Sequence, residues 1–511
     1  MAKSISKYII CGIVLFLAFL AILGTDWATL NYSFESFDQV IYTLMTSVTS
    51  ASDGAIKAFI VQNVIPALII VIIIILSYIL LKKFTSNSDI WLNFKIRNKN
   101  VDIKINHSKF SKLLVIITPI LLFLYAMYYM IDKLYIVDFI KNNVEKSTFI
   151  EEYYVDPTGV EISFPDEKRN LIYIFLESME GTFTSYENGG AFEENYIDEL
   201  TDLANQYINF SANELIGGAN MYNGTTWTMG GMIAQTAGIP LKIAFSTNAQ
   251  EGYANGLVKG AYTLGDILDD AGYNQYIMVG SKLDFGGRRV YFEQHGNYQA
   301  FDYFTAIEDG LIDEDYYVFW GYEDELLFQY AKEKLTEISK EDEPFNFTML
   351  TVDTHAPDGY MSDWCEEKYD NQYLNAVACS SKQVGDFIEW IQDQDFYENT
   401  TIVITGDHLS MNNYSFDTID EDYNRSVYNV YINSAIDTDC SNNRMFSVFD
   451  YYPTTLAALG VDIKGNKLGL GTNLFSCEKT LDEQFTYYHI NSEITKTSTF
   501  YNNCINFGFC N

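Results

Sequence analysis

Residues 170–178 read Asn-Leu-Ile-Tyr-Ile-Phe-Leu-Glu-Ser, and the apolar run 171–176 within them ends at Glu177. A short apolar run bounded by polar residues is typical of a strand buried on both faces. Comparable runs occupy Tyr276–Val279, Phe345–Val352, Thr401–Ile404 and Val427–Ile432. Stretches with apolar residues at helical spacing lie between them, including Glu323–Ser339 and Tyr373–Gln394. This alternation of strands and helices predicts an α/β domain with a mostly parallel central sheet.

Polar side chains follow three of these predicted strands. The first strand ends in Glu177, the third leads into Asp353-Thr354-His355, and the fourth leads into Gly406-Asp407-His408. The carboxyl ends of parallel strands meet at one edge of a sheet, where ligands bind. Two carboxylates and one imidazole suit Mn²⁺, Zn²⁺ or Mg²⁺ with one position left open. The alternative for Asp407-His408 is a capped turn that leaves the histidine on the surface.

A threonine-rich segment at Gly224–Met232 offers three hydroxyl groups, those of Thr225, Thr226 and Thr228, before a pair of glycines. A threonine hydroxyl is a weak nucleophile at neutral pH. A metal ion lowers its pKa and allows it to attack phosphorus. The alternative is a purely structural helix start, because threonine caps helices well.

Three long apolar runs precede this domain, at Tyr8–Leu23, Val64–Leu81 and residues 113–130. Each has about the length of a helix that crosses a bilayer. No small-x-small cleavage motif follows the first run, so we expect it to stay in place as an anchor. The sequence predicts a membrane region with three transmembrane helices over residues 1–135, a linker over 136–164 and an extracytoplasmic domain over 165–511.

The orientation in the membrane follows from the loop between the second and third runs. This loop is rich in basic residues: Lys82, Lys83, Lys95, Arg97, Lys99, Lys104, Lys109 and Lys112. Cytoplasmic loops next to spans carry an excess of lysine and arginine. The basic loop is therefore predicted inside, and everything from about residue 150 onward is predicted outside.

The chain is strongly acidic, with 32 Lys and Arg against 68 Asp and Glu and a formal charge of −36. Binding to nucleic acid needs a basic surface, so the sequence argues against nucleic acid as a partner. A large negative charge otherwise mainly affects the solubility of a protein. The function has to be inferred from the residues of the site.

Six cysteines follow the membrane region, and a seventh, Cys11, lies in the first apolar run. An even set outside the cytoplasm favours disulfides. Sequence proximity suggests Cys365 with Cys379 and Cys504 with Cys510, which would leave Cys440 with Cys477, although spacing alone leaves other pairings open. Metal binding is the weaker interpretation because no Cys-x-x-Cys pair is present.

Together these motifs resemble the sulfatase-like branch of the alkaline phosphatase superfamily, in particular bacterial phosphoglycerol transferases and lipoteichoic acid synthases. The resemblance covers roughly residues 165–475 and implies an alkaline phosphatase/sulfatase-like domain behind N-terminal transmembrane helices. It is carried by Asn170–Ser178, by Trp227-Thr228 with Gly238-Ile239-Pro240-Leu241, by Asp353–Tyr360 and by Gly406–Leu409.

The resemblance implies that Glu177, Asp407 and His408 bind a divalent metal, most readily Mn²⁺, with Zn²⁺ and Mg²⁺ as alternatives. It also implies a threonine nucleophile that serves as a fourth ligand. In related enzymes a serine or threonine follows the nucleophile by three residues, and Thr225 with Thr228 fits this pattern. We therefore predict Thr225 as the nucleophile, with Thr226 as the first alternative and Thr228 as the second.

Further residues of the site are implied by the same resemblance. His355 resembles a catalytic histidine that contacts the phosphate of the transferred group. Arg288, in the motif Phe285-Gly-Gly-Arg-Arg, resembles an arginine of the headgroup pocket, and His295 is a second substrate-binding candidate.

The predicted function is transfer of phosphoglycerol from phosphatidylglycerol to a hydroxyl of a glycan or lipid-linked acceptor, by a multi-pass protein of the bacterial inner membrane whose catalytic domain is periplasmic. One alternative is a phosphoethanolamine transferase, for which acidic pocket residues would argue. A sulfatase is disfavoured because its Cys-x-Pro-Ser-Arg motif is absent from the sequence. The alternative from another class is a non-catalytic membrane-anchored interaction protein.

Overall fold

The computed structural model describes residues 2–32, 36–42, 57–85, 90–96, 99–105, 107–242, 256–412 and 414–510. Contacts divide the chain into two units. The first consists of Met1–Phe37 with Ala51–Phe139, and the second consists of Asp38–Ser50 with Ile140–Asn511. The extracytoplasmic domain predicted over residues 165–511 lies within the second unit.

The first unit contains the apolar helices. These are α1 (Ala2–Tyr32), α4 (Ile65–Thr85), which continues the short helix η1 (Ile60–Val64), and α5 (His107–Lys133). They contain three stretches long and apolar enough to cross a membrane, at Tyr8–Leu30, Lys57–Leu80 and Leu113–Lys133. All three predicted apolar helices are therefore present.

The predicted basic loop contains an antiparallel hairpin of β1 (Ile90–Ile96) and β2 (Lys99–Ile105). The side chains of residues 81–112 lie outside the described part of the structure. The predicted orientation of this loop stays a prediction.

The second unit is built around a seven-stranded sheet with the order β5-β10-β9-β4-β8-β6-β7. In chain order its strands are β4 (Asn170–Leu176), β5 (Gly218–Ala219), β6 (Asn274–Val279), β7 (Gln299–Phe301), β8 (Phe345–Leu350), β9 (Thr400–Gly406) and β10 (Val427–Ile432). The five strands from β9 to β7 are parallel to one another, whereas β10 pairs antiparallel with both of its neighbours, β9 and β5. The predicted α/β class with a mostly parallel sheet is confirmed.

Successive residues of β4 face opposite sides of the sheet, as the two-residue repeat of a strand requires. Leu171, Tyr173 and Phe175 belong to one hydrophobic core. Ile172 and Ile174 belong to the other. Both sets are fully buried, which explains why the sequence of this strand is a continuous apolar run.

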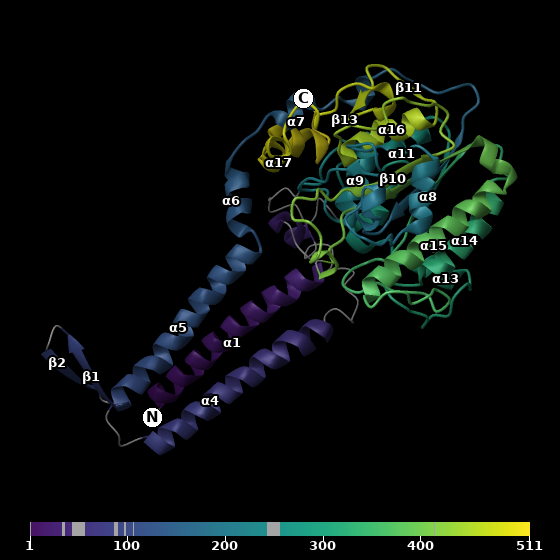
Figure 1. Ribbon diagram of the computed structural model, residues 1–511. Coiled ribbons are helices and arrows are strands. Elements are labelled where there is room, and N and C mark those ends of the chain that lie inside the picture. The colour runs from purple at the N-terminus through teal and green to yellow at the C-terminus, as the bar shows by residue number, and fades with distance from the viewer. Residues whose placement is uncertain are drawn as a thin grey trace. The chain divides into compact units, whose positions relative to one another are not determined.

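Helices cover both faces of the sheet (Figure 1). On one face lie α8 (Asp198–Gln206), α14 (Asp324–Ile338) and α15 (Gln372–Gln392). On the other lie α9 (Thr228–Ala237), α11 (Leu264–Asp270), α12 (Arg288–Gln294) and α16 (Tyr451–Ala458). The predicted helices at Glu323–Ser339 and Tyr373–Gln394 correspond to α14 and α15, with ends that agree within two residues.

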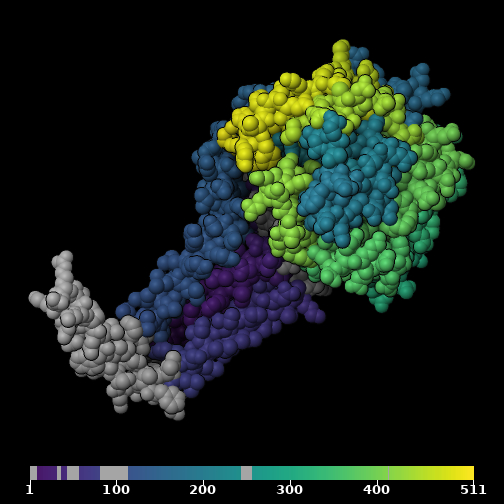
Figure 2. Space-filling model, in the orientation of Figure 1, coloured from purple at the N-terminus to yellow at the C-terminus, as the bar shows by residue number. Residues whose placement is uncertain are grey.

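The remaining elements are short and peripheral. They are α6 (Ile136–Val144), α7 (Phe149–Tyr153), α13 (Tyr303–Glu308), α17 (Tyr487–Thr495) and the small strands β3 (Ile162–Ser163), β11 (Asp462–Ile463), β12 (Lys467–Leu468) and β13 (Gly471–Thr472). Helix α17 packs on α7, and Figure 2 shows the C-terminal residues in yellow on the surface of this unit. Phe149 joins the two helices by ring contacts with Phe485 and His489.

Three disulfides join Cys365 to Cys379, Cys440 to Cys477 and Cys504 to Cys510. The pairing suggested by sequence proximity is therefore confirmed, and Cys11 is free. Disulfides of this kind fit a domain that folds in an oxidising compartment.

We expect the Cys440–Cys477 disulfide to stabilise the second unit more than the Cys504–Cys510 disulfide does. The two bonds span 37 and 6 residues respectively. Loop-closure entropy then predicts losses of about 4 and about 2 kcal/mol when each pair is replaced by serines. Thermal denaturation of the two double variants in detergent measures the difference. Equal melting temperatures would contradict the entropic estimate.

Candidate active site

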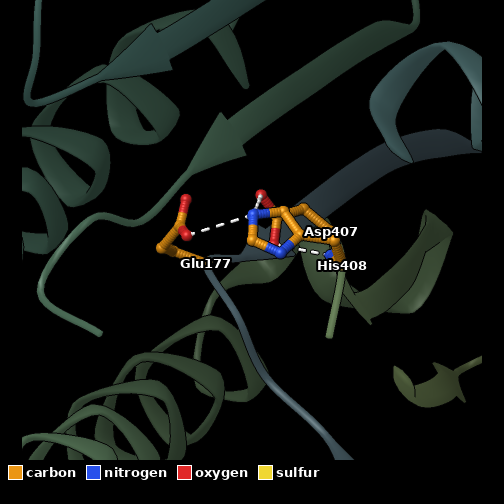
Figure 3. Close-up of side chains that lie close together, drawn as sticks. All are labelled: Glu177, Asp407 and His408. Carbon is orange, nitrogen blue, oxygen red and sulfur yellow. Dashed lines mark hydrogen bonds and ion pairs between the residues drawn. The ribbon is translucent and has the colours of Figure 1, made fainter. Parts of the chain in front are cut away.

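The register of the sheet brings Glu177 and Asp407 together. Leu176 at the end of β4 pairs with Gly406 at the end of β9, so the two carboxylates follow directly on neighbouring strands. His408 Nε2 lies 3.3 Å from Glu177 Oε1 and 3.6 Å from Asp407 Oδ2 (Figure 3). All three side chains are buried, and one ligand atom from each lies within 4.8 Å of the others. The convergence expected from the strand ends is present.

Ser178, which sequence reasoning did not single out as a functional residue, ties the two carboxylates together. Its φ is 55°, a conformation that non-glycine residues seldom adopt. Its N–H donates to Asp407 Oδ1 at 2.8 Å, and its hydroxyl donates to Glu177 Oε1 at 2.8 Å. Backbone strain of this kind clusters at functional sites. The sequence carries no signal for it beyond the position after Glu177.

The backbone of Glu177 is held by the loop that follows β8. Its N–H donates to Thr351 Oγ1 at 3.0 Å, and its carbonyl oxygen accepts a hydrogen bond from the hydroxyl of Thr354. Both threonines are completely buried. The position of the Glu177 carboxylate is therefore determined by three strand ends, those of β4, β8 and β9.

The electrostatics of the cluster favour a positive charge at its centre. Burial and the charge of Glu177 raise the pKa of Asp407 to about 7. Burial alone would raise the pKa of Glu177, but His408 and His355 lower it to about 2. Burial would lower the pKa of His408, but Asp407 and Glu177 raise it to about 10. Two buried carboxylates thus create a field suited to a cation.

The hydrogen bonds around the cluster are compatible with a metal ion as the cation at its centre. His408 Nδ1 lies 2.7 Å from the carbonyl oxygen of Leu409, which can only accept, so Nδ1 carries the hydrogen. In the neutral imidazole the Nε2 lone pair then faces the carboxylates, as in many metal-binding histidines. Asp407 Oδ2 is buried and has no hydrogen-bond partner within the described residues. The donor set Glu177, Asp407 and His408 is therefore suited to a divalent metal.

Helix α9 is fixed against the carboxyl end of β9. The Gln235 amide donates to the carbonyl oxygen of Gly406 at 2.8 Å. Gly231 packs so closely that a Cβ on it would lie 1.9 Å from the carbonyl oxygen of Asp407, which only glycine permits. The helix begins after Trp227, which is extended at φ −144° and ψ 160°. This packing places the first helical residue, Thr228, at the cluster.

Thr228 is the threonine that reaches the cluster. Its Oγ1 lies 3.3 Å from Glu177 Oε2 and 3.5 Å from His408 Nε2. It stands at the N-terminus of α9, where the helix dipole and the backbone N–H groups favour an anion. The two signals that could have selected Thr228 from sequence are its place at the start of the helix and the Gly-Gly pair at 230–231.

Thr225, which sequence spacing favours as the nucleophile, forms hydrogen bonds within its own turn, and its catalytic role stays a prediction. Its hydroxyl donates to the carbonyl oxygen of Tyr222 at 2.9 Å and accepts from the Tyr222 N–H at 2.9 Å. These bonds close a local turn, a common use of a threonine hydroxyl. Thr226 Oγ1 is buried without a hydrogen-bond partner among the described residues.

His355 lies near the cluster on the loop after β8. It acts on the pKa of Glu177 and packs against Trp320, with ring centroids 4.7 Å apart. Its Nδ1 lies 2.7 Å from the carbonyl oxygen of Ala356, so Nδ1 carries a hydrogen and Nε2 is the nitrogen that can exchange a proton. The ring is only partly buried, which fits a group that meets substrate.

Arg288 is buried beside the cluster and held by its own backbone turn. It donates to Ser281 Oγ at 3.0 Å and to the carbonyl oxygens of Lys282 and Phe285 at 2.9 and 3.1 Å. Burial lowers its pKa to about 10, and the nearby charge of Glu177 acts in the opposite direction. A buried guanidinium near the site is suited to an anionic group.

His295 is the predicted residue that the structure does not bring to the cluster. Its Nδ1 lies 2.9 Å from Asp266 Oδ2, and its Nε2 lies 3.0 Å from the carbonyl oxygen of Leu257. Both ring nitrogens are therefore occupied by structural partners. The side chain is 4% exposed and links α12 to α11.

Comparison with known proteins finds relatives of this chain. Phosphoglycerol transferase I from Escherichia coli O127:H6 is 33% identical over 337 residues, which are 63% of this chain and 41% of that protein. Phosphoglycerol transferase I from Shigella flexneri is equally similar. The matched region therefore spans less than half the length of these curated relatives.

Solved structures of a similar kind include a lipoteichoic acid synthase from Listeria monocytogenes, with 19% identity and a TM-score of 0.46 over 65% of this chain and 82% of that one. A lipooligosaccharide phosphoethanolamine transferase from Neisseria meningitidis has 14% identity and a TM-score of 0.47 over 89% of this chain and 84% of that one. The sulfatase family model matches residues 169–461, more than half of the 511 residues. On that match, this chain belongs to the sulfatase family.

Proposed function

We propose that this protein is a membrane-anchored transferase that moves phosphoglycerol from phosphatidylglycerol to a hydroxyl of a glycan or lipid-linked acceptor. The observation that carries the proposal is the hydroxyl of Thr228, which meets two members of a buried Glu177–Asp407–His408 cluster at the N-terminus of α9. The name and 33% identity of the phosphoglycerol transferase relatives support the choice of phosphoglycerol as the transferred group.

Glu177, Asp407, His408 and Thr228 would hold the divalent metal. When bound, it would lower the pKa of the Thr228 hydroxyl and offset charge on the phosphoryl oxygens. The metal-binding role, including the preference for Mn²⁺ over Zn²⁺ and Mg²⁺, belongs to the proposal.

In the first half-reaction, the Thr228 hydroxyl gives its proton to solvent, and Oγ1 attacks the phosphorus of the lipid. A Thr228–phosphorus ester forms, the bond from phosphorus to the diacylglycerol oxygen breaks, and that oxygen takes up a proton. His355 Nε2 would supply this proton, because Nδ1 is committed to the Ala356 carbonyl. The first residues of α9 and Arg288 would stabilise negative charge on the transferred group.

In the second half-reaction, the acceptor hydroxyl gives its proton to His355 and attacks the same phosphorus. The Thr228–phosphorus bond breaks, and Thr228 Oγ1 takes back from solvent the proton that it lost in the first half-reaction. Two displacements through one covalent intermediate are the ordinary logic of nucleophilic catalysis. His355 ends the cycle in the protonation state in which it began.

The membrane region would keep the catalytic unit beside its lipid donor. We propose a multi-pass protein of the bacterial inner membrane, with the catalytic unit on the periplasmic side. The three disulfides support this side, because disulfides persist outside the cytoplasm.

The donor can be tested with the purified full-length protein in detergent. Incubation with Mn²⁺ and labelled phosphatidylglycerol should release diacylglycerol, whereas labelled phosphatidylethanolamine should release little. The reason is that Arg288 is a cation buried beside the cluster, which suits a neutral polyol and repels an ammonium group. Thin-layer chromatography of the labelled lipid measures the result.

Release from phosphatidylethanolamine alone would replace the proposed donor and identify a phosphoethanolamine transferase. No release from either lipid, by protein that binds metal, would contradict the transferase proposal and favour a non-catalytic interaction protein. A Glu177→Gln variant serves as the blank, since it removes one carboxylate of the cluster.

A further inference from the structure

A short segment between the first two apolar helices belongs to the catalytic unit. Residues 38–50 join residues 140–511 in the contact-defined second unit, and residues 37–42 are helical in the described part. Gln39, Val40 and Tyr42 are 3%, 7% and 4% exposed. Tyr42 is a member of the same hydrophobic core as Trp227 and Leu257. The segment is therefore packed into the catalytic unit.

Tyr42 has contacts next to two residues of the proposed site. Its ring packs against Trp227, with centroids 6.0 Å apart, and Trp227 directly precedes Thr228. Its hydroxyl donates to the carbonyl oxygen of Gly286. The Tyr42 side chain thus contacts both the residue that precedes α9 and the turn that precedes α12.

The contact with Tyr42 matters for the Gly286-Gly287 turn because two glycines give this backbone many accessible conformations. Both glycines have positive φ, 66° and 71°, a conformation open mainly to glycine. The turn leads directly into Arg288, and Tyr42 lies close enough to Arg288 to act on its pKa. Glycine loses more conformational freedom on folding than other residues, so a hydrogen bond to this turn restricts where Arg288 can lie.

The other end of the segment is also anchored. The carboxylate of Asp38 and the ammonium of Lys242 influence each other's charge, although burial is the largest effect on both. Burial raises the pKa of Asp38 to about 6 and lowers that of Lys242 to about 8. Lys242 Nζ donates to the carbonyl oxygen of Ile494 at 2.7 Å. Within the described residues 38–42, both Asp38 and Tyr42 therefore interact with the second unit.

Two buried hydrogen-bond donors in the residues just before Thr228 are also relevant. Trp227 Nε1 and Thr226 Oγ1 have no hydrogen-bond partner in the part of the chain that the structure describes. Buried unpaired donors are costly and usually have an explanation. A polar substrate next to Thr228 would supply the missing acceptor.

We infer that Tyr42 is a positioning residue of the active site, which orders Trp227-Thr228 and the Gly286–Arg288 turn around the headgroup of the donor. The inference rests on the proposed function for its substrate and goes beyond it by assigning a catalytic consequence to the loop between the first two apolar helices. That loop would then serve the chemistry as well as connecting two spans.

The test compares full-length wild-type protein with Tyr42→Phe and Tyr42→Ala. Tyr42→Phe keeps the ring against Trp227 and loses the bond to Gly286, so the KM for the donor lipid should rise about 3- to 10-fold with kcat nearly unchanged. Tyr42→Ala loses both contacts, so kcat should also fall by about 10-fold or more. Diacylglycerol release measures both constants.

Hydrogen exchange supplies a readout that does not depend on the donor. In Tyr42→Ala, amides of residues 224–230 and 285–290 should exchange faster, and the rest of the sheet should be unchanged. Tyr428→Phe is the matched control. Its buried hydroxyl also donates to a backbone carbonyl, that of Leu200, on the other face of the sheet, and its loss should leave kinetics and both segments as in the wild type.

Wild-type KM, kcat and exchange in both Tyr42 variants would overturn the inference. So would faster exchange throughout the unit, or an equal kinetic loss in Tyr428→Phe, because either result indicates general destabilisation. If Tyr42→Ala does not fold, the KM of Tyr42→Phe tests the inference by itself, and an unchanged KM would overturn it. If the wild type itself releases no diacylglycerol, the proposed function fails, and exchange in Tyr42→Phe at residues 285–290 still decides the positioning role.

Discussion

Replacing Thr228 by alanine should abolish diacylglycerol release while the protein stays folded. The loss should be roughly 1000-fold or more, as is typical when a covalent nucleophile is removed. Thr228 is the threonine whose hydroxyl meets Glu177 and His408, so no other hydroxyl of the segment replaces it at this point. The three remaining ligands should still retain metal, which elemental analysis of the variant measures.

Thr225→Ala is the matched control, because it removes a threonine hydroxyl from the same segment. The hydroxyl of Thr225 closes a turn with Tyr222. Its loss should lower the free energy of unfolding by about 1 kcal/mol and leave most of the activity. Thr228→Ser keeps a hydroxyl at the cluster and should retain a measurable part of the rate. An inactive Thr225→Ala beside an active Thr228→Ala would reverse the assignment.

Trapping identifies the nucleophile directly. With donor lipid and no acceptor, the wild type should accumulate a glycerophosphoryl group on the peptide that contains residues 225–228, and fragmentation should place it on Thr228. An adduct on Thr225 or Thr226 would move the assignment. Continued turnover with no adduct at all would point to direct transfer from lipid to acceptor.

The sheet could be predicted from sequence because its strands are buried on both faces. Burial of this kind produces continuous apolar runs, and each run of the parallel sheet coincides with a strand within two residues at either end. The strand ends also located the metal candidates, since parallel register alone brings Glu177 beside Asp407. Both inferences depend on repeating backbone geometry, which sequence patterns report well.

The choice among the threonines could not be made in this way. Spacing favoured Thr225, but the decisive facts are nonlocal: Gly231 packs on the carbonyl of Asp407, and Gln235 bonds the end of β9, so the first residue of the helix lies at the cluster. His295 failed for the same reason, because its partner Asp266 lies on a different helix. Side-chain pairings between distant segments leave no periodic signal in the sequence.

Asp407→Asn should remove the metal and the activity together. The isosteric amide can keep the bonds that Asp407 Oδ1 accepts from the N–H groups of Ser178 and His408. At the position of Asp407 Oδ2, the amide replaces an anionic oxygen by a neutral NH2 group. Removal of one charged ligand from a buried site should weaken metal binding by about 100-fold or more. Elemental analysis after gel filtration measures the metal, and diacylglycerol release measures the activity.

Asp450→Asn is the control that separates metal loss from a general effect on buried carboxylates. Asp450 is equally buried and accepts backbone hydrogen bonds from Ser447 and Thr472 at 2.8 and 2.7 Å, but it belongs to the packing of η8 (Val448–Asp450) against β13. Its variant should keep stoichiometric metal, whatever it does to stability.

The stabilities of these variants provide a second test of the same site. Metal should raise the melting temperature of the wild type and of Asp450→Asn but not that of Asp407→Asn, because a ligand stabilises only the folded state that binds it. In chelator, Asp407→Asn should melt no lower than the wild type, since two buried carboxylates repel each other and one has been neutralised. Stoichiometric metal in Asp407→Asn would show that the cluster of Glu177, Asp407 and His408 is not the metal site.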